Sequence, residues 1–160
     1  MSSPTALVLE DDRASREALG RLSENEGFRP ILAKTIAEAR VALERETPDI
    51  LLLDLDLPDG SGLEVLEDLK DRPDVDVVLV SGTATIDDAV LAMREGAVDV
   101  LTKPVDPKRL RGDLAAARRT AGLRSEVDRL RGELKSLGRF GRLVGRSPAC
   151  KQLYDHIGKV

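Results

Sequence analysis

Three uninterrupted runs of apolar residues dominate the hydrophobic pattern of the chain, at residues 6–9, 50–53 and 77–80. None of them alternates polar with apolar positions, so each run predicts a strand that is buried on both faces. Such strands are typical of a parallel sheet covered by helices. Weaker patterns predict two more strands at residues 29–33 and 98–101. Because Pro30 cannot donate a backbone hydrogen bond, we place the strand at residues 29–33 at an edge of the sheet.

Helical patterns separate these strands. We predict helices at residues 13–26, 36–46, 61–70 and 86–95, and a last helix that begins at Pro107, a residue well suited to a first helical turn. Strand and helix therefore alternate five times. With right-handed crossovers this order predicts an α/β fold, a flavodoxin/CheY-like doubly wound five-stranded parallel sheet with strand order 2-1-3-4-5, over about residues 4–120.

Composition narrows the class of protein. Aromatic residues make up only 2% of the 160 residues, so aliphatic side chains must fill the core. No apolar run approaches the roughly 20 residues of a membrane-spanning helix, and the first residues lack the order of a secretory signal. The single cysteine, Cys150, excludes an internal disulfide framework. We expect a cytoplasmic protein that makes no contact with a membrane.

Charge is distributed unevenly along the chain. Residues 1–117 contain 14 Lys and Arg against 25 Asp and Glu, a net charge of −11, whereas residues 118–160 contain 11 against 4, a net charge of +7. This change of sign predicts a domain boundary near residue 118.

Polar side chains follow the ends of four predicted strands. Glu10 and Asp11 follow the first strand, Asp54 the third, Ser81 and Gly82 the fourth, and Lys103 the fifth. The carboxyl ends of parallel strands form one edge of the sheet, so these residues should converge. Three carboxylates at one place suit a hard cation such as Mg²⁺. A lysine and a hydroxyl beside them would complete a pocket for phosphoryl transfer, with Asp54 as the nucleophile.

Four segments resemble the motifs of two-component response regulator receiver domains, in that family's order and spacing. They are LEDD at 9–12, LDLDLPDG at 53–60, VSG at 80–82 and LTKP at 101–104. The resemblance implies that Asp54 accepts a phosphoryl group from a sensor histidine kinase. It further implies that Asp11 binds Mg²⁺ directly, Glu10 binds it through water, and Asp56 offers its backbone carbonyl. Ser81, on a switch loop with Gly82, would bind the phosphoryl group together with Lys103.

One position departs from the family's pattern. Val100 stands where many members have a Tyr or Phe whose rotation reports phosphorylation. The resemblance therefore implies that the Ser81 loop and the fourth helix carry the signal. Other residues of the motifs have structural interpretations: we expect Asp12 to cap a helix, and Asp59 and Gly60 to shape a turn.

An enzymatic alternative comes from the segment Asp54-Leu55-Asp56, which also resembles the nucleophile motif of haloacid-dehalogenase-type phosphatases. That family usually has Thr or Val two places after the second aspartate, where this chain has Pro58. It also places the motif on an early strand, and here a strand ending in Glu10 comes first. We therefore favour a receiver, with self-catalysed phosphoryl acceptance and slow hydrolysis, over an enzyme.

Apolar residues recur at intervals of 4, 3, 4 and 3 beyond the receiver segment: Leu123, Val127, Leu130, Leu134 and Leu137. This is the spacing of a two-stranded coiled coil, so we predict a homodimer. Gly122 and Gly132 weaken the pattern, and a helix that folds back on its own domain is the alternative. The arginines among these residues suit a solvated face better than a nucleic-acid site, because no groove-reading motif accompanies them.

Residues 143–160 resemble the opening of the AAA+ ATPase domain of NtrC-type sigma-54-dependent activators. The phosphate-binding motif GxxxxGK[ST] is absent from this chain, so we expect no ATPase activity from it. We thus predict a receiver domain at 1–119, a coiled-coil linker at 120–140 and the start of a truncated AAA+ domain at 141–160. Sigma-54 RNA polymerase and DNA would be reached only through downstream domains. A receiver with a different output, or one acting alone by protein binding, remains the alternative.

Overall fold

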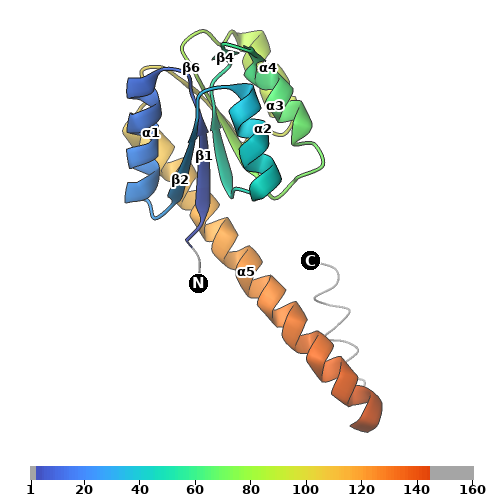
Figure 1. The fold of residues 1–160 in the computed structure, drawn as a ribbon. Coiled ribbons are helices and arrows are strands. Elements are labelled where there is room, and N and C mark those ends of the chain that lie inside the picture. The colour runs from blue at the N-terminus through green and yellow to red at the C-terminus, as the bar shows by residue number, and fades with distance from the viewer. Residues whose placement is uncertain (1–2, 145–160) are drawn as a thin grey trace. The chain divides into compact units, whose positions relative to one another are not determined.

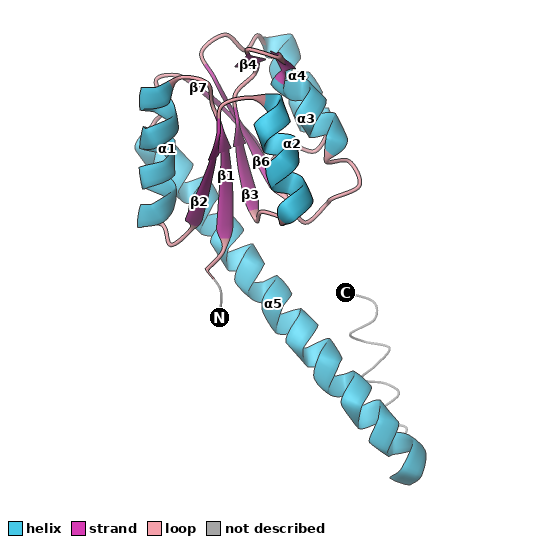
Figure 2. Cartoon of the chain, in the orientation of Figure 1, coloured by secondary structure: helices cyan, strands magenta, loops and turns pink. Residues whose placement is uncertain are grey.

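A single parallel sheet forms the centre of the computed structural model, which describes residues 3–144. Its strands are β1 (Thr5–Leu9), β2 (Arg29–Ala33), β3 (Ile50–Leu53), β6 (Asp76–Ser81) and β7 (Asp99–Thr102). They lie in the order β2-β1-β3-β6-β7, and every pair of neighbours is parallel (Figures 1 and 2). The predicted order 2-1-3-4-5 is confirmed, and so is the edge position of the strand that contains Pro30.

Helices cover both faces of this sheet: α1 (Arg13–Asn25), α2 (Ile36–Arg45), α3 (Gly62–Asp68), α4 (Ile86–Arg94) and α5 (Pro107–Val144). Successive side chains of a strand point to opposite faces, so β1 serves two cores. Leu7 and Leu9 belong to the cluster formed with α2, α3 and α4, while Ala6 and Val8 belong to the cluster formed with α1 and the first turns of α5. The five-fold alternation of strand and helix predicted from the sequence is therefore confirmed.

A short hairpin was not predicted. Strands β4 (Asp56–Leu57) and β5 (Gly60–Ser61) pair antiparallel directly after β3. Gly60 occupies a φ of +148°, which favours glycine and explains why the turn is placed here. Asp59 does more than shape the turn, because its carboxylate accepts hydrogen bonds from the Ile36 and Ala37 amides at the start of α2.

Helix α5 is the last described element. It begins at Pro107, as predicted, and continues to Val144. The chain divides into two compact units, residues 1–119 and 120–160. Leu123 and Leu130 are exposed on α5, with 67% and 38% of their surface accessible. The coiled coil needs a second chain and stays a prediction; the Leu137 side chain and residues 145–160, with most of the predicted AAA+ segment, lie outside the described residues. Within residues 3–144, no helix is both long and apolar enough to cross a membrane.

Candidate metal-binding and phospho-acceptor site

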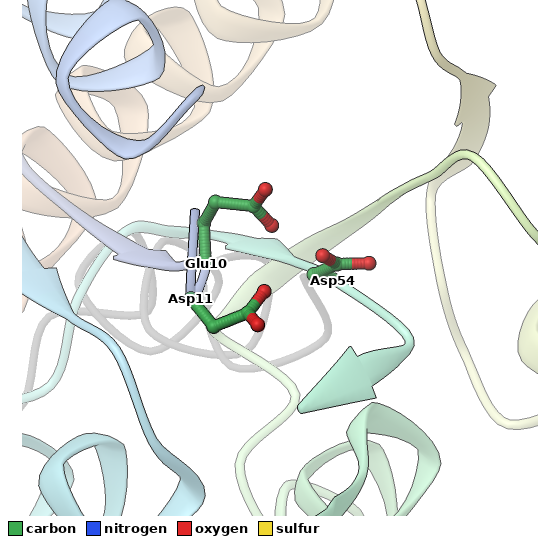
Figure 3. A group of neighbouring side chains, drawn as sticks. All are labelled: Glu10, Asp11 and Asp54. Carbon is green, nitrogen blue, oxygen red and sulfur yellow. The ribbon is translucent and has the colours of Figure 1, made fainter. Parts of the chain in front are cut away.

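Three acidic side chains meet at the carboxyl edge of the sheet. Glu10 and Asp11 follow β1 and Asp54 follows β3, and one oxygen of each carboxylate lies within 4.8 Å of the others (Figure 3). The parallel pairing of β1 with β3 sets this arrangement, because Leu9 is directly opposite Leu53. The sequence predicted that these side chains would converge, and the structure places them together.

Lys103 reaches the same place from the end of β7. Its Nζ lies 2.5 Å from Oε1 of Glu10 and 3.3 Å from Oδ2 of Asp54. Burial alone would lower the pKa of Lys103, but the hydrogen bond to Glu10 and the charge of Asp54 outweigh it, and the pKa is raised. The lysine is therefore a firmly charged counter-ion for two carboxylates.

Glu10 is the most buried of the acids, with 1% of its side chain exposed. Burial, followed by the hydrogen bond with Asp54, raises the pKa of Glu10 to about 7 even though Lys103 acts in the opposite direction. Its Oε2 atom is buried and has no hydrogen-bond partner among the described residues. An orphaned carboxylate oxygen beside two more carboxylates is a donor set that fits a divalent cation with oxygen ligands.

Backbone contacts hold Asp54 at the edge. Its amide donates to the carbonyl of Leu9, and its Oδ1 lies 3.4 Å from the Asp56 amide. Gly62 packs so closely behind it that an added Cβ would overlap the carbonyl oxygen of Asp54. The Asp54 carboxylate therefore sits on a backbone that is closely packed against Gly62. The direction of the Asp56 carbonyl, which the resemblance implies as a ligand, stays a prediction.

Side-chain hydrogen bonds connect the predicted switch loop to Asp56 at the start of β4. Ser81 is fully buried at the end of β6, and its Oγ lies 3.3 Å from Oγ1 of Thr83 and accepts from the Thr83 amide. The Thr83 hydroxyl in turn donates to Oδ2 of Asp56. Gly82 lies beside the Lys103 stem. The resemblance implied a role only for the carbonyl of Asp56, and no sequence pattern indicated that its side chain would meet Thr83.

Asp12 in the β1–α1 turn and Arg16 on α1 complete the site. Asp12 caps α1 by accepting from the Ser15 amide, and the cap lowers its pKa. Arg16, which the sequence did not single out, donates to the carbonyl oxygens of Glu10 and Asp11.

A match to a family model shows which kind of domain contains this acidic cluster. The family model described as the response regulator receiver domain matches residues 6–115. The chain belongs to the response regulator receiver family. The receiver match includes all four motifs, so the Asp54 motif is part of a receiver rather than of a dehalogenase-type phosphatase.

Curated relatives and solved receivers agree with this assignment. The response regulator protein PilR of Pseudomonas aeruginosa is 36% identical over 168 residues, which cover 100% of this chain and 34% of that protein. The alginate biosynthesis transcriptional regulatory protein AlgB of the same organism is 34% identical over 157 residues, covering 96% and 34%. The beryllofluoride-activated NtrC4 receiver domain dimer is 30% identical, with a TM-score of 0.67 over 72% of this chain and 96% of that one. The receiver chain thus spans about a third of the length of PilR and AlgB.

Proposed function

We propose that this receiver accepts a phosphoryl group on Asp54 from a sensor histidine kinase in a Mg²⁺-dependent reaction. The observation that carries the proposal is the meeting of Glu10, Asp11 and Asp54 within 4.8 Å, with Lys103 against two of them. An oxygen of Asp54 would attack the phosphorus. The bond from phosphorus to the kinase histidine would break, and its nitrogen would keep the electron pair.

The residues at the edge divide the work of positioning and charge neutralisation. Mg²⁺ would be held by Asp11, Asp54 and the carbonyl of Asp56, with Glu10 acting through water. When bound, the ion would neutralise part of the negative charge on the phosphoryl group. Lys103, already charged and 3.3 Å from Asp54, would pair with a phosphoryl oxygen. Ser81 would donate its hydroxyl to another.

Phosphorylation would reach the surface through the switch loop. The new group adds a charge of about −1.5 to −2. For Ser81 to bind it, the Ser81 hydroxyl must turn away from Thr83, which itself bonds to Asp56. The loop between β6 and α4 would therefore move, and the helix with it, without the aromatic rotation that Val100 excludes. A coupling of roughly 1–3 kcal/mol would be enough to change how two receivers pair.

The downstream partner follows from the resemblance of residues 143–160 to NtrC-type activators. We infer that the receiver controls an ATPase that activates sigma-54 RNA polymerase on DNA, in the cytoplasm, and that the ATPase and DNA-binding parts lie in further domains. The alignments with PilR and AlgB, which extend over nearly the whole of this chain, support this inference. The homodimer is supported by the similarity to a receiver described as a dimer.

The test is phosphorylation of the chain by acetyl phosphate with Mg²⁺, followed by intact-mass measurement. The wild type should gain one phosphoryl group, and Asp54→Asn should gain none. Asp59→Asn is the matched control, because Asp59 lies on the neighbouring turn outside the acidic cluster and the one side-chain oxygen of Asn can still accept the Ile36 hydrogen bond. Incorporation by Asp54→Asn, or no incorporation by the wild type, would contradict the proposal.

A further inference from the structure

The loop that presents Asp11 is held by a side chain from α1. Nη1 of Arg16 donates to the carbonyl oxygen of Glu10 at 3.0 Å and to that of Asp11 at 3.2 Å. These two carbonyls belong to the peptide groups before and after the Asp11 Cα. One guanidinium nitrogen therefore fixes both peptide planes that flank the acid.

We propose that Arg16 is a positioning residue that holds the Asp11 carboxylate in the orientation that binds Mg²⁺, an inference that rests on the proposed function. The backbone has only two soft dihedral angles at each residue. With both flanking peptide planes bonded to Arg16, those two angles at Asp11 are set, and the direction of its Cα–Cβ bond is set with them.

Asp11 needs this support because its own side chain is exposed, unlike those of Glu10 and Asp54. The turn is anchored on either side of Asp11: the Glu10 amide donates to the Ala33 carbonyl, and Asp12 caps α1. Arg16 supplies the contact in between. Partners that orient a ligand residue are worth about 10- to 100-fold in metal affinity when they are lost.

Loss of the Arg16 charge and loss of its two hydrogen bonds should change Mg²⁺ affinity in opposite directions. A positive charge near a cation site opposes Mg²⁺, so removing the charge alone would tighten binding. Removing the two hydrogen bonds would loosen Asp11 and weaken binding. The sign of the change in affinity therefore distinguishes the two roles.

Arg13 provides a matched control on the same helix. Its guanidinium lies 3.1 Å from Glu17, its side chain is 83% exposed, and it leaves the acidic loop untouched. Arg13→Met removes the same charge as Arg16→Met while keeping both loop hydrogen bonds. The pair isolates the effect of position.

The experiment is a calorimetric titration of the full chain with Mg²⁺ alone, together with thermal unfolding in the presence of a chelator. Arg16→Met should weaken Mg²⁺ binding about tenfold relative to Arg13→Met, with a similar unfolding midpoint in chelator. The Mg²⁺ concentration for half-maximal phosphorylation by acetyl phosphate should rise by the same factor, with the maximal rate retained at saturating Mg²⁺. Equal affinity of the two variants would overturn the inference.

Two further variants keep the outcomes separate. If Arg16→Met does not fold, Arg16→Lys against Arg13→Lys replaces it, because a lysine keeps the charge but lacks the reach and planar shape of arginine; equal affinities would again overturn the inference. If the wild type binds no Mg²⁺, or Asp11→Asn binds it equally well, the proposed metal site itself is wrong. Normal binding by the wild type, lost in Asp11→Asn but unchanged in Arg16→Met, would refute only the role of Arg16.

Discussion

Two buried carboxylate oxygens, Oε2 of Glu10 and Oδ2 of Asp113, have no hydrogen-bond partner within residues 3–144. Burial raises the pKa of both acids to about 7. Their surroundings differ, however. Glu10 lies against Lys103 in the cluster suited to a cation, whereas Asp113 on α5 shares a hydrogen bond with Asp99, which is already paired with Arg109. Glu10 therefore belongs to the candidate metal site, whereas Asp113 should make the stability of the fold depend on pH.

The pH dependence of stability should reveal Asp113. Its pKa is about 7 in the folded chain against 3.8 for an isolated aspartate, so the folded state binds this proton more tightly. Its contribution to stability is complete below about pH 4 and is lost as the pH rises through about 7. Asp113→Asn should be close to neutral at about pH 4 and should raise the free energy of unfolding by about 1 kcal/mol at about pH 8, allowing for solvent screening at this partly buried pair. Urea unfolding at both pH values measures this, and an equal effect at both would contradict it.

The Thr83 hydroxyl should act as a brake on phosphorylation. It bonds to Asp56 and to the Ser81 hydroxyl, which in the proposed function would turn toward the phosphoryl group. Thr83→Val keeps the shape of the side chain and removes both contacts. One hydrogen bond contributes about 1 kcal/mol, so the rate of phosphorylation by acetyl phosphate should rise about fivefold. Thr85→Ser, a conservative change at the α4 cap, is the control; a rate for Thr83→Val equal to that of the wild type would show that the loop is not held by this contact.

Residues of the site differ in how far the sequence could predict them. Glu10, Asp54 and Lys103 directly follow strands β1, β3 and β7, so the parallel sheet alone brings them to one edge. Arg16 and the Thr83–Asp56 contact depend on how loops turn and which way side chains point, and no spacing rule encodes either. The hydrogen-bonding potential of Arg16, three residues into a helix that follows the acidic turn, is the one signal that could have drawn attention to it.

At the scale of elements, the buried strands were predictable because they are uninterrupted apolar runs, and the helices because of their spacing. The ends of these elements were less predictable. The third helix was expected at residues 61–70 and is Gly62–Asp68. The β4–β5 hairpin was missed because two-residue strands leave no periodicity. It lies between Asp54 and α3 in the chain.

Because Gly62 at the start of α3 packs against Asp54, alanine substitutions at Gly62 and at Gly112 should have opposite effects on stability. A Cβ at Gly62 would overlap the Asp54 carbonyl, so Gly62→Ala should displace the start of α3 and lower the free energy of unfolding by about 2 kcal/mol. Gly112 lies inside α5 with open space around it, so Gly112→Ala should raise the free energy by about 0.5–1 kcal/mol through helix propensity. Urea unfolding of both variants measures the difference. Changes of the same sign would contradict the close packing behind Asp54.

At the scale of the whole molecule, the net charge changes sign close to the boundary between the two compact units. The first compact unit ends at residue 119, next to the point where the net charge changes sign, and the receiver match ends at residue 115. The relatives that align over nearly the whole chain are about three times as long. In the proposed function, helix α5 would pass a change in pairing to the further domains.

Pairing through α5 can be tested at one seam position of the proposed coiled coil. Leu130 lies at a core position of the 4-3 pattern, so Leu130→Asp would place a charge at the seam between two chains and should raise the dimer dissociation constant by at least about tenfold. Ser125→Asp adds the same charge at an exposed position between two core positions and should pair like the wild type. Light scattering after size-exclusion chromatography, with and without beryllofluoride and Mg²⁺, measures the oligomeric state. If Leu130→Asp dimerises as tightly as Ser125→Asp, the apolar spacing of α5 is not a dimer seam, and any pairing must use the receiver unit itself.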